Sequence, residues 1–386
     1  MSLDHQQLNR RQFIKISTGG VVLAAGLGVS GCSGPTSATD PWRAAGSAYQ
    51  EPRRRALSYA ILAPNPHNRQ PWMADLSAPD TIVLYVDTDR LLPDTDPFSR
   101  QVTVGLGCFL ELLVMAAAAD GYEASVDPFP QGFDDRALDQ RPFAKVRFRA
   151  ASSAVTDPLF AHVLDRRSTK ETYSVDRPVA DDVLATLARA TRPTVMASSA
   201  NDAASVQRLR DLILEGWRIE YTTPEKLQES IDLMRLGRKE INASPDGIDL
   251  GGPFMEAMIA TGFISRTSLA DPGSFAWKSG LDMYGDMCVT SQAFVWLKTK
   301  GNTRLDQIEA GRAWVRVNLA ATGAKLAIHP MSQVLQEYEE MNGLYKTVHE
   351  EFAGDGETIQ MLGRLGYTSA VGPSPRWPLD AKVMNG

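Results

Sequence analysis

Apolar and polar positions follow a similar order in two parts of the chain. Residues 81–87 (TIVLYVD) are rich in β-branched side chains and alternate in polarity, which predicts a strand. An almost wholly apolar helix is predicted over residues 101–119, followed by a strand near 122–127. The order of strand, long helix and strand returns within residues 292–370, where the helix covers 305–326. The pattern faintly indicates two similar halves.

The helix predicted over residues 101–119 is apolar on all sides, which is typical of a buried helix. Its length approaches that of a membrane span, but Glu111 interrupts it, so we interpret it as the central helix of the first half. Further strands are predicted near 143–149 and 194–197, and further helices at 181–190, 202–221 and 224–238.

Residues 241–285 break this regular pattern. They contain the turn-like pieces SPDG, LGGP and DPGS together with a methionine-rich stretch and Trp277. A long Gly- and Pro-rich insertion with aromatic residues is unusual in a compact domain and is often a binding loop. We therefore predict a lid over residues 241–285.

The first residues carry an export signal rather than part of the fold. Residues 9–15 (NRRQFIK) hold the paired arginines, the phenylalanine and the lysine of a twin-arginine signal. The following VSGC looks like a bacterial lipobox in which Cys32 is lipidated. We predict a signal peptide over residues 1–32, the twin-arginine translocase as a partner, and a periplasmic lipoprotein that contacts the membrane only through this anchor. Cleavage without lipidation, which gives a soluble periplasmic protein, is the alternative.

Composition narrows the class of protein further. The chain has 386 residues, of which 43% are hydrophobic, and a net charge of -6. No long basic run and no zinc-like Cys/His spacing occurs, which argues against nucleic acid and metal as ligands.

Residues 33–48 are rich in Ser, Thr, Pro, Ala and Gly, and we predict a flexible tether there. Cys108 and Cys288 have no motif around them, so no catalytic thiol is predicted, and a disulfide between them stays open.

The stretch 63–72 (APNPHNRQPW) is a candidate binding loop. Its three prolines exclude a regular helix and a central strand. His67, Asn68 and Gln70 are therefore held stiffly beside Trp72. Amide donors and acceptors next to a large apolar ring suit a flat ligand with polar edges. The alternative is a capped helix followed by a proline-rich surface loop.

The stretch 165–173 (DRRSTKETY) is a second candidate. Arg166, Arg167, Ser168 and Lys170 fall within five positions. Arginine can grip a phosphate through paired N–H groups, and serine and lysine can each add a single donor. The alternative is a solvated basic turn whose charge neighbouring acids partly offset.

These pieces together resemble the nitroreductase superfamily. APNPHNRQPW is similar to its PS-x-HN-x-QPW loop, and RRSTKETY to its flavin-phosphate motif, with the aromatic residue one position late. LAIHPM and PSPRWPLDAKV resemble the segment along the flavin ring and the C-terminal tail. Because the HNRQPW loop precedes RRS here, the order resembles the Acg-type subgroup. The resemblance implies an α+β fold with antiparallel sheets flanked by helices, in which two fused halves, 49–155 and 156–386, imitate a homodimer within one monomer.

The resemblance also implies the site. FMN would be the cofactor, its phosphate held by Arg166, Arg167, Ser168 and Arg376, and Lys170 would reach the ribityl chain or the ring edge. Asn68 would bond the pyrimidine edge, while His67 and Gln70 shape the loop. The remaining implied contacts come from His329, Pro330 and Met331, which would lie along the ring near N5, mainly through backbone. No side chain is expected to act as catalyst, because flavin N5 carries the chemistry.

Two functions fit this reading. The first is an FMN-dependent oxidoreductase of nitroreductase type, which passes hydride or electrons from NAD(P)H or another donor to a small-molecule acceptor. The second is a protein that binds and sequesters flavin under a closed lid with little turnover. The state of residues 241–285 discriminates between them, because a segment packed on the ring favours sequestration.

Overall fold

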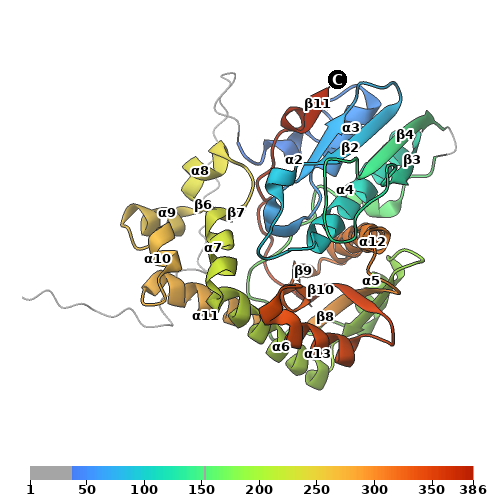
Figure 1. Ribbon diagram of the computed structural model, residues 1–386. Coiled ribbons are helices and arrows are strands. Elements are labelled where there is room, and N and C mark those ends of the chain that lie inside the picture. The colour runs from blue at the N-terminus through green and yellow to red at the C-terminus, as the bar shows by residue number, and fades with distance from the viewer. Residues whose placement is uncertain (1–36, 152–153, 386) are drawn as a thin grey trace, which may run out of the picture.

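The computed structural model describes residues 37–151 and 154–385 (Figure 1). The predicted signal peptide and Cys32 lie outside the described residues. Two antiparallel sheets lie on either side of a pair of long helices, α4 (Arg100–Ala119) and α12 (Arg304–Gly323). The fold is therefore α+β, with sheets flanked by helices, as predicted.

The first sheet has the strand order β11-β1-β2-β4-β3. Its strands are β1 (Trp72–Asp75), β2 (Thr81–Val86), β3 (Tyr122–Pro128), β4 (Ala144–Ala150) and β11 (Val383–Asn385). All neighbours are antiparallel except β1 and β11, which are parallel. The chain's C-terminal strand thus joins the sheet of the first half, so the two predicted halves interlock.

The second sheet has the strand order β5-β8-β10-β9, and all its neighbours are antiparallel. Its strands are β5 (Met196–Ala200), β8 (Ala293–Thr299), β9 (Ala327–Pro330) and β10 (Thr358–Gly366). The order repeats that of β1, β2, β4 and β3 in the first sheet, and each sheet has a long helix after its second strand. The faint two-fold pattern in the sequence therefore corresponds to a repeated topology.

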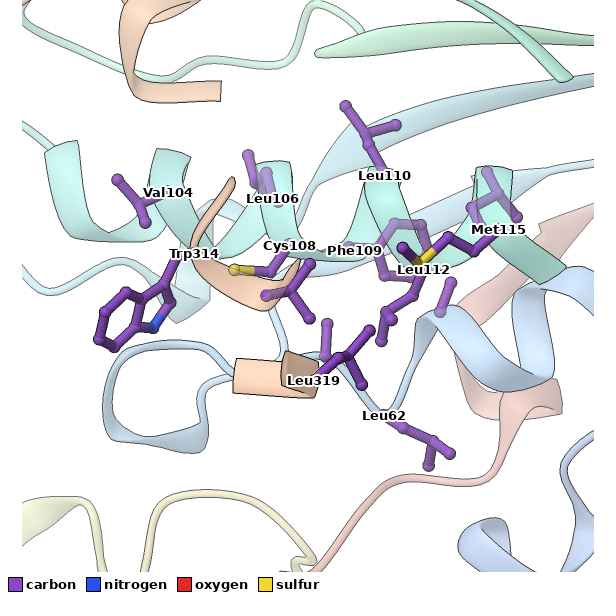
Figure 2. Packing of buried hydrophobic residues seen from close by; sticks show 14 of the residues in the cluster. Leu62, Val104, Leu106, Cys108, Phe109, Leu110, Leu112, Met115, Trp314 and Leu319 are labelled. Atoms are coloured by element: carbon purple, nitrogen blue, oxygen red, sulfur yellow. The ribbon is translucent and has the colours of Figure 1, made fainter. Parts of the chain in front are cut away.

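The helices α4 and α12 pack against each other at the centre of the molecule. Figure 2 shows Cys108 and Leu112 of α4 on the same side as Trp314 and Leu319 of α12, whereas Leu106 of α4 points the other way; all five are buried. Gly107 and Gly311 meet at the crossing, where a Cβ on Gly107 would lie 2.2 Å from Ile308 O and one on Gly311 would lie 1.9 Å from Val104 O. Only glycine allows the two backbones to approach this closely.

Helix α4 is long and apolar enough to cross a membrane, but 83% of its most apolar window is buried inside the protein. Its one acidic residue, Glu111, is 3% exposed and pairs with Arg192, Arg312 and Arg316. The interpretation of α4 as a buried core helix is confirmed, and its charge is compensated by ion pairs.

The remaining helices cover the sheets and form a side lobe (Figure 1). Around the sheets lie α3 (Pro52–Ala60), α5 (Asp181–Arg189), α6 (Ala203–Thr222) and α13 (Asn342–Phe352). The lobe contains α7 (Pro224–Asp232), β6 (Met234–Leu236), α8 (Gly237–Ala243), β7 (Ile248–Leu250), α9 (Pro253–Ala260), α10 (Arg266–Ala270) and α11 (Phe275–Val289). Short 3₁₀ helices are η1 (Pro66–Asn68), η2 (Thr88–Arg90), η3 (Pro158–His162), η4 (Gln333–Leu335), η5 (Glu339–Met341) and η6 (Leu379–Lys382).

Two structural features expected from composition are wrong. Residues 37–48 of the predicted tether contain helix α2 (Asp40–Ala44), in which Trp42 is only 5% exposed, and residues 33–36 lie outside the described residues. The loop-like structure expected for residues 241–285 is also wrong, because the segment is mainly helical, whereas its role as a lid stays a prediction. Cys108 and Cys288 are both free and buried, so no disulfide joins them. Burial raises the pKa values of both thiols to about 12.

Candidate functional site

The loop before β1 adopts a backbone that ordinary residues avoid. His67, Asn68 and Gln70 have φ of 46°, 51° and 50°, in the left-handed region. The side chain of Asn65 holds this shape, because its Oδ1 accepts the N–H of Gln70 at 2.7 Å and its Nδ2 donates to Ala63 O at 3.1 Å. Backbone strain of this kind persists only where the surrounding structure enforces it, and it clusters at functional sites.

The amide side chains of this loop bind other parts of the chain. Asn68 Oδ1 accepts from Arg376 Nη1 at 2.8 Å, and Asn68 Nδ2 donates to Pro375 O at 3.0 Å. Gln70 is fully buried; its Oε1 accepts the N–H of Trp377 and its Nε2 donates to Pro245 O. Gln70 therefore joins the loop to the C-terminal tail and to Pro245, and Asn68 binds Arg376.

Three arginines gather behind the loop, at the carboxyl end of α3. Arg376 donates from Nε to Ile61 O and from Nη2 to Leu62 O and Ala63 O, at 3.0–3.2 Å. Arg166 donates from Nη2 to the same Leu62 O at 3.2 Å. Cations stabilise the carbonyl end of a helix, which explains why α3 accepts both side chains.

These arginines have no acidic partner among the described residues. Arg166 and Arg376 are each 2% exposed, and Arg166 Nε and Nη1 and Arg167 Nε are buried without a hydrogen-bond acceptor. Burial and, secondarily, repulsion by neighbouring arginine lower the pKa of Arg376 to about 9; burial lowers that of Arg166 to about 10. Unpaired buried cations are costly unless an anion joins them. The cluster therefore fits a bound phosphate.

The other predicted phosphate residues are nearby but more exposed. Ser168 and Lys170 are both exposed, and Lys170 lies close enough to lower the pKa values of two histidines, His67 and His329. Burial is the larger cause of both shifts; it takes the pKa of His67 to about 4 and that of His329 well below its ordinary value. Both imidazoles are thus neutral at physiological pH, and Lys170 supplies the positive charge.

The predicted ring segment lies beside residues 165–173. The N–H of Thr169 donates to Ile328 O at 3.1 Å, which joins this segment to β9. His329 Nδ1 accepts from Arg364 Nε at 3.1 Å, and the Arg364 guanidinium lies 4.0 Å from the centre of the Tyr173 ring. The N–H of Met331 is occupied by Leu362 O, and its side chain is buried in the core, so a backbone N–H contact from Met331 is not available.

The structure therefore brings together most of the predicted site residues, which come from four separate segments. Arg166 and Arg376 share Leu62 O, Asn68 holds Arg376, and Lys170 lies near His67 and His329. A separate cavity of about 280 Å³ contains none of them; its lining is Phe98, Asp135, Arg136, Asn302, Gln307 and Glu337.

Sequence reasoning missed Asp246, which joins the side lobe to η2 and to the C-terminal tail. This carboxylate is 3% exposed and pairs with Arg90 and Arg235, and it accepts Trp377 Nε1 at 3.2 Å. Its pKa is lowered to about 2, because these hydrogen bonds outweigh its burial. The link is therefore present above pH 3.8, the ordinary pKa, and is lost as the pH falls toward 2. The SPDG turn was the available sequence signal.

Comparisons with known proteins agree with this geometry. No family model matches the chain. A Mycobacterium tuberculosis H37Rv protein provisionally named NAD(P)H nitroreductase Rv3131 is 27% identical over 86% of this chain and 90% of its own length. Acg from the same organism, also provisionally named an NAD(P)H nitroreductase, is 31% identical over 47% of this chain and 49% of its own.

Two solved nitroreductase structures are more distant in sequence. A Bacteroides fragilis nitroreductase with bound FMN shares 10% identity with a TM-score of 0.33, covering 56% of this chain and 91% of its own. The Mycobacterium smegmatis nitroreductase NfnB in complex with NADPH shares 15% identity with a TM-score of 0.33, covering 56% and 92%.

The chain is therefore similar over most of its length to Rv3131 and over about half of its length to Acg, both provisionally named NAD(P)H nitroreductases. This similarity confirms the predicted resemblance to the nitroreductase superfamily and its Acg-type subgroup.

Proposed function

We propose that the protein is an FMN-dependent oxidoreductase of nitroreductase type, which takes electrons from NAD(P)H or another donor and passes them to a small acceptor. The observation that carries this proposal is the buried arginine cluster, whose unpaired donors at Arg166 and Arg167 fit a phosphate monoester. The curated relatives named as NAD(P)H nitroreductases and the neighbour with bound FMN support the choice of cofactor and donor.

The chain's own residues bind and orient in this proposal. Arg166 and Arg167, whose buried donors lack acceptors, would hold the phosphate with charge-assisted hydrogen bonds, and exposed Ser168 would add a hydroxyl donor. Arg376, whose donors are bound within the chain, would add positive charge to the site. The Lys170 ammonium would lie beside the ring edge, where positive charge favours an anionic reduced ring. FMN supplies the hydride chemistry at N5, so no side chain needs to act as acid or base.

His67 and His329 complete the ring environment. Both are buried and neutral, since burial and Lys170 lower their pKa values. Arg364 Nε donates to His329 Nδ1, so His329 carries its proton on Nε2. Two neutral rings exclude water from the ring edge without cancelling the charge of Lys170.

We further propose export by the twin-arginine route and attachment through lipidated Cys32, on the strength of the NRRQFIK and VSGC pieces. The route carries folded proteins, which suits a chain that binds its cofactor before export. Loss of the membrane-bound fraction on Cys32→Ser substitution tests the anchor.

The first test is the visible absorbance spectrum of the folded protein purified with export blocked. The expected spectrum has the two bands of oxidised flavin, and anaerobic NADH bleaches them. Yellow protein that NADH does not bleach would identify a flavin protein with another donor or with little turnover. Colourless protein that also fails to take up added FMN contradicts the proposal, because the arginine cluster would then be structural.

A sequestering protein is the second candidate, and one observation favours it. The lobe segment around residue 246 is packed on the candidate loop: Gly247 N–H donates to Asn68 O at 3.2 Å, and Gln70 Nε2 donates to Pro245 O at 2.7 Å. A covered ring edge would limit access of nicotinamide to the flavin.

Replacing Asp246 by alanine separates the two candidates. The variant leaves Arg90, Arg235 and Trp377 without their shared carboxylate, so we expect the segment around residue 246 to be held less tightly over the loop. For an oxidoreductase gated by this segment, the rate of flavin reduction by NADH, followed by stopped-flow absorbance, is expected to rise several-fold. Asp271→Ala is the matched control, since Asp271 is exposed in the same lobe and its carboxylate accepts the N–H of Gly273. Release of flavin without faster reduction would contradict gating.

A further inference from the structure

The segment predicted to be a tether is instead a wall of the arginine cluster. Helix α2 is tied to the C-terminal tail by two hydrogen bonds: Trp42 Nε1 donates to Ser374 O at 2.8 Å, and the N–H of Arg376 donates to Ala38 O at 2.8 Å. Ala38 N–H also donates to Asn242 Oδ1 of the lobe at 3.1 Å. These contacts place Trp42, which is 5% exposed, beside the arginines.

The indole of Trp42 faces three guanidinium groups at once. Its ring centre lies 4.7 Å from the Arg167 carbon Cζ, 5.5 Å from that of Arg376 and 5.8 Å from that of Arg166. The face of an indole is the negative end of its quadrupole and attracts cations within about 6 Å. Among the described residues, no carboxylate forms an ion pair with these three arginines, and the face of Trp42 is the aromatic surface that all three guanidinium groups share.

We infer that Trp42 is a positioning residue of the phosphate site, which holds the three guanidinium groups in place and shields them from water so that a phosphate monoester is retained. The inference rests on the proposed function. Exclusion of water lowers the local dielectric constant and strengthens each arginine–phosphate contact. A ligand without phosphate gains nothing from this wall, so Trp42 should distinguish FMN from riboflavin.

The position of Trp42 also gives the N-terminal segment a role in retaining the cofactor. Cofactor retention then depends on residues 38–42, which lie only a few positions after the predicted anchor Cys32. A chain trimmed beyond Trp42 would keep both sheets and yet lose its grip on the phosphate.

The test compares FMN and riboflavin affinities of the full chain and of Trp42→Leu, measured by quenching of flavin fluorescence. We expect Trp42→Leu to weaken FMN binding about ten-fold, in line with loss of cation–π contacts to buried arginines, and to leave riboflavin binding unchanged. Trp42→Phe keeps an aromatic face and should recover most of the FMN affinity. Trp296→Leu is the matched control, because Trp296 is also buried and donates from Nε1 to a carbonyl, Phe352 O, far from the arginines.

Two results would overturn the inference. An FMN to riboflavin affinity ratio equal to that of the unmodified chain means that Trp42 only helps the segment to pack. The same drop in both affinities, or no recovery by phenylalanine, means a general loss of structure.

Inorganic phosphate separates this inference from the proposed function. If the chain binds no flavin but phosphate raises its melting temperature, and Trp42→Leu abolishes that rise, the wall stands and the FMN proposal falls. If neither flavin nor phosphate binds, both fall.

Discussion

Replacing Arg166 by methionine is expected to weaken FMN binding at least about 100-fold and, at the same time, to raise the melting temperature of the flavin-free protein. The first effect follows because truncating one partner of a buried, hydrogen-bonded charge pair costs about 2–5 kcal/mol. The second follows because Arg166 Nε and Nη1 are buried without acceptors, so methionine removes an uncompensated charge at similar volume. Flavin titration and thermal melts of the same samples check both.

The loss of one hydrogen bond does not offset this gain. Leu62 O, which accepts from Arg166, also accepts from Arg376 and so stays satisfied. A substitution that weakens ligand binding while it stabilises the ligand-free protein identifies a residue kept for the ligand. Selection for stability alone would not keep an unpaired buried cation.

Arg364→Met is the control for the sign of the stability change. Arg364 is also fully buried, but its guanidinium donates to His329 Nδ1 and to the carbonyls of Met287, Thr169 and Glu171. Its removal breaks these four hydrogen bonds, leaves His329 Nδ1 and Glu171 O without that donor, and should lower the melting temperature. If Arg166→Met destabilises the flavin-free protein as much as Arg364→Met does, the cluster is structural and the phosphate site is refuted.

The elements with strong local signals could be predicted from the sequence. The alternating residues of β2 and the apolar run of α4 give strand and helix within a residue or two of the observed bounds. The stiff loop at residues 63–72 was also predictable, because three prolines leave it few conformations. Local chemistry decides these elements, so no distant contact is needed to see them.

Helix α2 could not be predicted because distant residues hold it in place. Its composition is that of a linker, and five residues are too few for a helix that is stable alone. Trp42 is ordered by Ser374 and the arginines, more than 100 positions away in the sequence. The local sequence pattern does not reveal contacts between residues so far apart in the chain.

The side lobe was misread for a different reason. Its glycines, prolines and serines sit at helix starts rather than in loops: Gly252 and Pro253 begin α9, and Ser274 caps α11. Proline is favoured at the first helical position because its missing N–H would be unpaired there anyway. Short helices with such boundaries give the same composition as a flexible insertion.

Side-chain partners within the site were predictable only in part. Residue types predicted Arg166 and Arg376 as anion ligands. Arg166 keeps two buried donors without an acceptor, whereas the donors of Arg376 are bound within the chain. Asn68 was expected to face the ligand, but its amide is used by Arg376 and Pro375. The choice between these partners depends on how the C-terminal tail crosses the loop. The contacts of each residue with FMN itself stay predictions.

Replacing Gly311 by alanine is expected to destabilise the protein by about 3 kcal/mol or more, the upper end for overpacking a core. The new Cβ would lie 1.9 Å from Val104 O, a backbone atom that cannot rotate away, so α4 and α12 must separate. Denaturant unfolding measures the loss. Gly343→Ala in α13 is the matched control: a Cβ there meets nothing within 4 Å, so alanine's better helix propensity should leave stability unchanged or raise it. Equal effects of the two substitutions would refute the close crossing.

The repeated topology predicts that Gly107 and Gly311 play equivalent roles in the packing of α4 against α12. Gly107 faces Ile308 O as Gly311 faces Val104 O, so each helix offers the other the same contact, as in an isologous interface. Gly107→Ala should therefore cost nearly as much as Gly311→Ala. The double variant should cost clearly less than the sum, because helices that have already moved apart for one methyl group have room for the other. Additive costs would mean that the two glycines relieve separate clashes, and the central helix pair would then lack the two-fold relation that the strand orders indicate.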